Sequence, residues 1–324
     1  MRNATLLVGL LLLAGCAGRQ SVLDPAGEDA RDLFDLFRVM VIAALLLWGA
    51  VALLFIYVTR INVSAMPRKL AETLIVGGGI VFPVLLLGAL LAYSLPMMGA
   101  QRQEGDGLVV RITAEQWWWR VEYLPADGGT PVIAANELRL PVGARSELIL
   151  NAHNVIHSFW VPALGGKTDM IPGRETRMSL KPERTGVFRG QCAEFCGASH
   201  ALMAFETVAM APQDFDAWLA EEARDAAAPG DPLAQAGAEV FAREGCGACH
   251  AIRGTEAIGR VGPDLTHVGA RKSLGAGILP MERGALMRWI GHAEGLKPEV
   301  KMPSFDYLEE DDLRALAAYL EGLT

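Results

Sequence analysis

The residues best suited to chemistry lie in one short stretch, residues 190–203. Two thiols, an imidazole and a thioether occur within twelve residues of it, as Cys192, Cys196, His200 and Met203. Thiolate and thioether are soft ligands that suit copper, and imidazole suits copper as well. The same spacing would align these side chains on one helical face, where the cysteines would be buried apolar residues or a redox pair. Because glycine and serine interrupt the stretch and form helices poorly, a ligand loop is the better prediction.

A set of four ligands on one loop usually needs a further ligand from another part of the fold. His153 and His157 are the candidates in this sequence. A lone histidine beside a strand is more often structural than a metal ligand. The loop by itself therefore leaves the choice between them open.

A second motif lies near the C-terminus, where Cys246, Cys249 and His250 form a Cys-x-x-Cys-His sequence. This is the attachment pattern of haem c, in which two thioether bonds hold the porphyrin and the histidine binds the iron. A bare Cys-x-x-Cys pair would also suit a thioredoxin-like or a zinc site. The adjoining histidine, the expected export of the chain and the lack of a second such pair argue against both.

The segment around this motif resembles the small class I cytochromes c. Residues 261–265 are similar to the loop whose proline supports the haem histidine in that family. The family takes its sixth iron ligand from a methionine late in the domain, and Met302 fits best, with Met281 and Met287 as rivals. A methionine ligand raises the haem potential. The segments 235–244 and 310–323 are expected to be helices.

The fifth cysteine, Cys16, follows a basic residue and an apolar run, which is the layout of a secretory signal peptide. Residues 13–16, Leu-Ala-Gly-Cys, also resemble the bacterial lipobox, in which the cysteine is lipidated and becomes the new N-terminus. An ordinary signal peptide with a coincidental cysteine is the alternative. An odd cysteine count argues against a simple disulfide framework.

Two uncharged apolar runs, residues 39–58 and 73–95, are each long enough for a membrane helix of about 20 residues. Buried helices of a soluble protein are the less favoured alternative. Three basic residues stand against Glu72 alone in the connection between the runs, so the positive-inside rule places this loop in the cytoplasm. Everything after residue 95 is then expected outside.

The formal net charge of −8 argues against nucleic acid as a partner. The acidic excess is concentrated in residues 214–231, a stretch expected to form a short helix and then a linker. It indicates either a solvated linker or a surface that steers a basic partner. Between residues 108 and 210, short alternating segments broken by glycine-rich turns predict a small β-sandwich or barrel. The expected strands include residues 137–142, 147–150, 175–180 and 205–210.

Several motifs together resemble cytochrome c oxidase subunit II, over roughly residues 35–212. They are residues 116–119, 155–162 and 167–174 and the loop from Cys192 to Met203. The resemblance implies a cupredoxin-like domain with a mixed-valence dinuclear copper centre. Its ligands would be bridging Cys192 and Cys196, terminal His157 and His200, axial Met203 and the backbone carbonyl of Glu194.

The same resemblance implies three further roles. The Glu194 side chain would help to hold a magnesium ion shared with the catalytic subunit, since a hard carboxylate suits that ion. Trp117 would be the aromatic residue at which electrons enter from a donor. Glu72 would lie at the mouth of a proton channel. The alternative is that Glu72 is only a charged residue at a helix end whose side chain extends to the membrane surface.

The fold class expected is a multidomain membrane protein with a two-helix transmembrane hairpin, an all-β cupredoxin-like domain and an all-α cytochrome c domain. The expected segments are a signal peptide (1–15), a membrane segment (16–98), a copper domain (99–212), an acidic linker (213–231) and a cytochrome c domain (232–324).

The function expected is that of a bacterial inner-membrane oxidase subunit, with both cofactor domains on the periplasmic face. It would receive electrons from a soluble cytochrome c or similar donor. It would pass them to a haem-copper catalytic subunit I, which with further subunits reduces dioxygen and translocates protons; this chain holds no oxygen site. A copper-centre subunit of a related nitric oxide reductase and a membrane-anchored copper-delivery protein are the alternatives.

Overall fold

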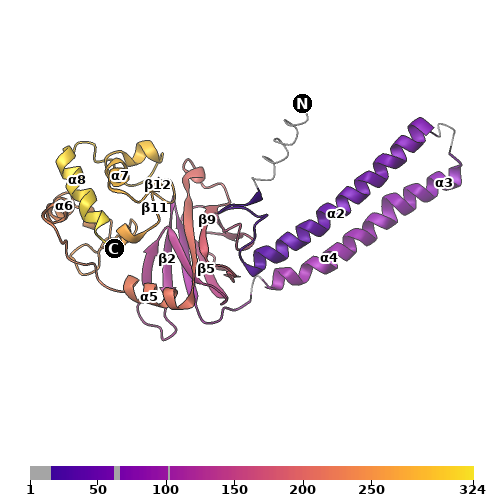
Figure 1. The fold of residues 1–324 in the computed structure, drawn as a ribbon. Helices are drawn as coiled ribbons and strands as arrows, with labels where there is room; N and C mark the ends of the chain where they lie inside the picture. The colour runs from indigo at the N-terminus through magenta and orange to yellow at the C-terminus, as the bar shows by residue number, and fades with distance from the viewer. Residues whose placement is uncertain (1–15, 62–65, 101–102) are drawn as a thin grey trace, which may run out of the picture.

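The computed structural model describes residues 16–61, 66–100 and 103–324, and the expected signal peptide lies outside these residues. The chain forms a long helical hairpin, a central β-sandwich and a helical C-terminal domain (Figure 1). The hairpin and the helical domain lie on opposite sides of the sandwich (Figure 1). This arrangement confirms the fold class expected from the sequence.

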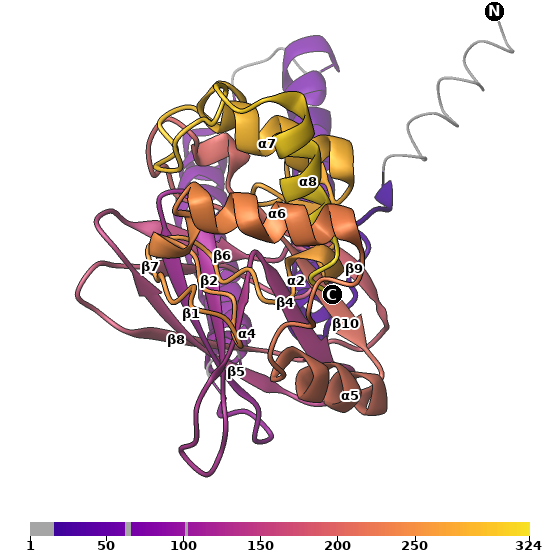
Figure 2. The same ribbon diagram turned by 90° about the vertical axis from the view of Figure 1, so that its left-hand side faces the viewer.

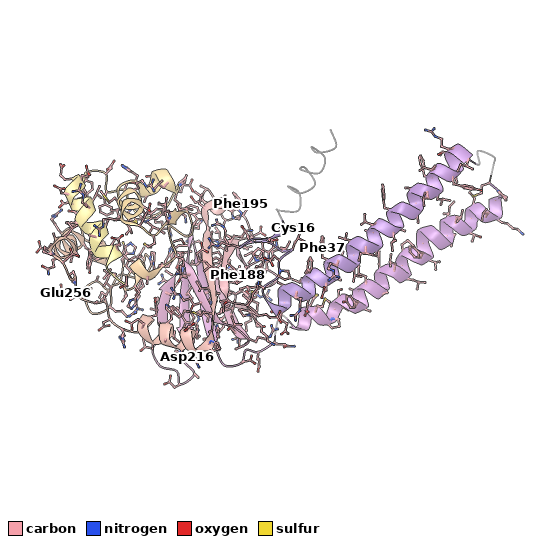
Figure 3. The ribbon with its side chains drawn as sticks, viewed as in Figure 1. Cys16, Phe37, Phe188, Phe195, Asp216 and Glu256 are labelled. Carbon is pink, nitrogen blue, oxygen red and sulfur yellow. The ribbon has the colours of Figure 1, made fainter. Side chains whose placement is uncertain are left out.

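The first arm of the hairpin is α2 (Glu28–Ile56), continued by the π-helical turn η2 (Tyr57–Ile61). The second arm runs through α3 (Arg68–Thr73), η3 (Leu74–Val81) and α4 (Phe82–Ala100). Both arms are long and apolar enough to cross a membrane, and their apolar windows are not buried within the chain. Figure 3 shows their side chains projecting outward along both arms. Such an exposed apolar surface suits contact with lipid or with other membrane helices.

The sandwich consists of two five-stranded sheets, with the strand orders β3-β2-β1-β5-β8 and β4-β10-β9-β6-β7. Side chains alternate between the core and the outside along β2, as the period of a strand requires. Trp119, Phe159 and Phe205 pack edge to face or stacked in the centre. The strands are β1 (Val109–Glu115), β2 (Trp118–Leu124), β3 (Val132–Ala135), β4 (Glu137–Pro141), β5 (Ser146–Ala152), β6 (His157–Trp160), β7 (Thr168–Met170), β8 (Thr176–Leu180), β9 (Gly186–Cys192) and β10 (Ala204–Met210).

The acidic stretch between the two cofactor domains consists of a short helix followed by an extended segment, as its sequence predicted. It begins with α5 (Pro212–Glu222), which packs on the sandwich because Phe215 is buried and its ring lies 6.1 Å from that of Tyr123. An apolar face of this kind holds a helix against a core regardless of the charges on its outer side. Residues 225–230 have no regular structure and lead into the helical domain.

The helical domain is built on α6 (Pro232–Arg243), α7 (Arg283–Leu296) and α8 (Glu310–Glu321), which lie in front of the sandwich in Figure 2. The Asp231 carboxylate caps α6 by accepting hydrogen bonds from two backbone amides of its first turn. At the crossing of α6 and α8, a Cβ on Gly237 would lie 2.0 Å from the Ala315 carbonyl oxygen, so only glycine allows this approach. Short elements complete the chain: η4 (His200–Leu202), η5 (Cys246–Ala248), η6 (Val268–Ala270), β11 (Ser273–Leu274) and β12 (Leu279–Pro280).

Candidate functional site

The thiol-rich loop connects β9 to β10 at one end of the second sheet. Cys192 is the last residue of β9, and Cys196 follows in the loop. His157 begins β6, which pairs with β9 so that Phe159 lies opposite Cys192. Pairing of adjacent strands therefore brings the distant histidine to the loop, a relationship that sequence spacing does not contain.

Five side chains converge there. The Sγ atoms of Cys192 and Cys196 are 3.8 Å apart, much further than the bond of about 2.05 Å in a disulfide. The Nδ1 atom of His157 lies 3.7 Å from the Cys192 sulfur, and that of His200 lies 3.5 Å from the Cys196 sulfur. The Sδ atom of Met203 is 3.9 Å from the Cys196 sulfur. The structure thus brings together all five side chains predicted from the sequence.

The alternative histidine, His153, does not reach this cluster. Its side chain is 61% exposed and lies 3.0 Å from the carboxylate of Glu115. His157 instead is fully buried, and its ligand atom lies within 4.8 Å of those of Cys192 and Cys196. Of the two candidates, the geometry favours His157.

The contact between the two sulfurs favours the thiolate of Cys192 over that of Cys196. It lowers the pKa of Cys192 and raises the pKa of Cys196. The backbone carbonyl oxygen of Glu194 lies 3.1 Å from the Cys192 sulfur. Two sulfurs, two imidazole nitrogens, a thioether and a carbonyl oxygen form a largely buried and mostly soft donor set, which fits copper better than magnesium or calcium.

The Cys-x-x-Cys-His motif opens onto a cavity of about 310 Å³ between the helical domain and the sandwich. Cys246, Cys249, His250 and Met302 all line it. Met281 and Met287 are not among its lining residues but pack against the apolar core of the helical domain. Met302 is therefore the methionine that shares a cavity with the candidate haem histidine.

His250 is oriented for binding a metal through one nitrogen. Its Nδ1 lies 2.7 Å from the carbonyl oxygen of Pro263, which can accept a hydrogen bond from this nitrogen and leave Nε2 free. Burial lowers the pKa of His250, so the neutral imidazole is favoured. A Cβ on Gly262 would come within 2.5 Å of the ring, so glycine is required where the loop crosses the histidine. These features fit a haem ligand.

Trp117 lies between the two sites. It lines the same cavity as His250, and its indole nitrogen donates a hydrogen bond of 3.0 Å to the carbonyl oxygen of Cys196. The Gln116 amide donates to the same oxygen at 2.9 Å. Only 4% of Trp117 is exposed. The sequence indicated an aromatic residue at a docking face, but not that the chain's own C-terminal domain covers it.

The remaining predicted residues lie outside these two centres. Glu72 is in α3 and pairs with Arg68 one helical turn away, at 2.7 Å. The side chain of Glu194 points away from the core and is exposed, as is Cys16. Sequence reasoning missed Lys297, a buried lysine from the helical domain that contacts Trp117. Nothing in its local sequence distinguishes it from a surface lysine.

Comparison with known proteins decides the family. Residues 126–209 match the family model described as cytochrome c oxidase subunit II, periplasmic domain, and residues 234–324 match that of cytochrome c. Cytochrome c oxidase subunit 2 of Alkalihalophilus pseudofirmus is 34% identical over 97% of this chain and 94% of its own length. The chain belongs to the cytochrome c oxidase subunit II family.

A second relative agrees with this assignment. Cytochrome c oxidase subunit 2 of Bacillus subtilis is 31% identical over 97% of the chain and 94% of its own length. The crystal structure of the periplasmic domain of subunit II of cytochrome oxidase from Bradyrhizobium japonicum is 30% identical, with a TM-score of 0.35. The matched region covers 37% of this chain and 96% of the chain in that crystal structure.

Membership makes this subunit II part of an oxygen-reducing enzyme complex. The subunit II domain implies copper and the cytochrome c domain implies haem. Neither the nitric oxide reductase nor the copper-delivery alternative receives support from these relatives. The two apolar helices fit an anchor in the membrane.

Proposed function

We propose that this chain is the electron-input subunit of its oxidase. It would relay electrons from a soluble cytochrome c or similar donor, through a haem c and a dinuclear copper centre, to the haem-copper catalytic subunit I. The observation that carries the proposal is the position of Trp117, which forms a wall of the haem cavity and also donates a hydrogen bond to Cys196 in the copper loop.

Four residues would hold the haem. Cys246 and Cys249 would attach the porphyrin by thioether bonds, and His250 and Met302 would be the axial ligands of its iron. All four line one cavity, and the Pro263 carbonyl fixes the orientation of the histidine ring. A methionine ligand raises the reduction potential, which suits an acceptor from a soluble cytochrome.

The copper ligands proposed are bridging Cys192 and Cys196, terminal His157 and His200, axial Met203 and the Glu194 carbonyl. When bound, the haem and the copper pair would each carry one electron at a time. Sharing the electron over two coppers would keep the structural change of the site on reduction small. The protein's part is to hold these ligands rigidly. His157 is fully buried and its ring packs edge to face against Trp119, with ring centres 6.4 Å apart.

The exposed face of the copper loop suits contact with the catalytic subunit. Phe195 is 75% exposed, and Ile156 and the Glu194 side chain are exposed beside the same cluster. Exposed apolar side chains next to a functional loop are typical of protein interfaces. We propose that subunit I, with further oxidase subunits, covers this face, and that Glu194 contributes there to a shared magnesium site.

We further propose that the hairpin spans the bacterial inner membrane and holds both cofactor domains on the periplasmic side. The basic residues of the loop between the arms support a cytoplasmic loop. Glu72 would then lie near the cytoplasmic face, where it could take protons into a channel of the proton-translocating complex. Lipidation of Cys16 would add a second anchor on the outer side.

Metal and haem analysis of the purified native complex tests this function. Two coppers for the outer domain and one covalently attached haem c per chain are expected, with an electron spin resonance signal delocalised over two copper nuclei. Cys196→Ser should abolish the dinuclear signal and leave the haem attached, whereas Cys249→Ser should affect the haem alone. A single copper with a mononuclear spectrum would contradict the dinuclear assignment.

A further inference from the structure

Lys297 is buried between the two cofactor domains. It follows directly after α7 in the helical domain, and only 2% of its surface is exposed. Most lysines stay in water because an ammonium group loses its hydration on burial. Burial lowers the pKa of Lys297 to about 7. A position this unfavourable for a lysine requires compensating contacts.

Those contacts are two backbone carbonyl oxygens, one from each domain. The ammonium donates a hydrogen bond of 2.7 Å to the Trp117 oxygen in the sandwich and one of 2.9 Å to the Gly275 oxygen in the helical domain. One side chain therefore joins the haem domain to the main chain of Trp117. The indole of that residue in turn contacts the copper loop through Cys196.

Further hydrogen bonds surround this contact. The hydroxyl of Ser199, in the copper loop, donates 2.6 Å to the carbonyl oxygen of Pro298, the residue after Lys297. The backbone amide of Ala204 donates 3.0 Å to the oxygen of Ala276, and the Arg189 guanidinium donates 3.2 Å to Gly277. The haem domain is thus hydrogen-bonded to both sides of the copper loop, and within this interface the Lys297 amine bonds the main chain of both domains.

We propose that Lys297 is a positioning residue for electron transfer, holding the haem domain docked on Trp117 so that the haem cavity stays against the copper loop. It touches neither set of proposed cofactor ligands and acts through the main chain of Trp117 and the docking of the domain. The effect on electron transfer rests on the function proposed above. The docking of the two domains does not, and it can be measured separately.

The test uses the native complex with Lys297→Met, which keeps the length of the side chain but removes its donors. Because two buried hydrogen bonds are lost, the docking equilibrium constant should fall about tenfold or more. Hydrogen exchange of the Ala204 amide, which bridges the interface, should rise correspondingly. Internal haem-to-copper electron transfer should slow and become dependent on salt.

Lys272→Met is the matched control, because that lysine side chain is exposed at the same interface and the charge change is equal. This control should leave both the hydrogen exchange of the Ala204 amide and the rate of haem-to-copper electron transfer unchanged. Lys297→Arg keeps the donors and should retain most of the protection of that amide against exchange. If Lys297→Met does not assemble, Lys297→Leu, which also lacks donors, replaces it with the same expectations. The proposal would be overturned if exchange of the Ala204 amide rises no more in Lys297→Met than in Lys272→Met.

Hydrogen exchange distinguishes a failure of the docking role of Lys297 from a failure of the proposed electron route. Exchange of the Ala204 amide is measured without electron transfer, so a wrong electron route would not alter that result. Loss of protection in Lys297→Met with an unchanged internal rate would refute positioning for electron transfer, even though the lysine fastens the domains. Unchanged copper and haem spectra in all variants are expected, because Lys297 acts on docking and not on either centre.

Discussion

The indole of Trp117 and the carbonyl oxygen of Cys196 are joined by a hydrogen bond of 3.0 Å beneath the haem domain. The cytochrome c domain therefore occupies the face at which an external donor would otherwise meet this tryptophan. A domain tethered through residues 225–230 has a high effective concentration at this face, because the linker is short. External electrons are then expected to enter through the haem domain.

Replacing the indole should slow the internal step. In Trp117→Phe the hydrogen bond to Cys196 is lost, and we expect haem-to-copper transfer to slow at least about tenfold, equivalent to about 1.4 kcal/mol in the barrier. Flash-induced electron transfer in the complex measures this. Trp218→Phe, in α5 on another part of the sandwich, is the control and should leave the rate unchanged. Equal rates in the two variants would remove Trp117 from the route.

Met302→Ala should leave the haem covalently attached, because Cys246 and Cys249 carry the tether, but should lower its reduction potential. Redox titration with optical spectra measures this change. Met281→Ala serves as the control because Met281 packs away from the haem cavity. If Met281→Ala alters potential and spectrum while Met302→Ala does not, the sixth ligand has been misassigned.

Gly237→Ala should destabilise the cytochrome c domain. The new Cβ would lie 2.0 Å from the Ala315 carbonyl oxygen, so α6 and α8 must move apart, at a cost of about 1–3 kcal/mol or more. Gly284→Ala in α7 meets no atom within 4 Å and should be neutral or slightly stabilising. Thermal unfolding followed in the haem absorbance compares the two, and equal melting temperatures would contradict the close helix crossing.

Ionic strength should separate the internal from the external step. The contacts of Lys297 and Ser199 at the domain interface are buried or partly buried, so salt should affect the internal transfer little. Reduction by a soluble donor depends on exposed charges, which are screened over about 8–10 Å at physiological salt. In stopped-flow experiments with a donor that has a basic face, raising the salt concentration should therefore slow only the reduction of the haem by that donor. A salt-dependent internal step would mean that the domains are not stably docked.

The sequence predicted much of this arrangement because its strongest signals are local. The ligand loop, the Cys-x-x-Cys-His motif and two long uncharged runs each lie within about two dozen residues. The strands expected at 137–142 and 205–210 correspond to β4 and β10. Alternation and turn residues set such elements locally.

Relationships between distant segments could not be predicted in the same way. The choice of His157 over His153 depends on the pairing of β6 with β9. The acidic stretch predicted a short helix, but not that α5 packs on the sandwich through Phe215. The burial of Lys297 depends on how two domains dock, and its sequence neighbours carry no periodic signal of that contact.

Electrons are expected to flow from the haem domain to the copper loop. Stopped-flow reduction of the native complex by a soluble cytochrome, with His250→Ala compared with the unaltered protein, measures this order. Because the haem domain covers Trp117, we expect copper reduction in His250→Ala to be slowed by orders of magnitude while the copper spectrum is unchanged. Copper reduced as fast in His250→Ala as in the unaltered complex would show that the donor reaches the copper centre directly.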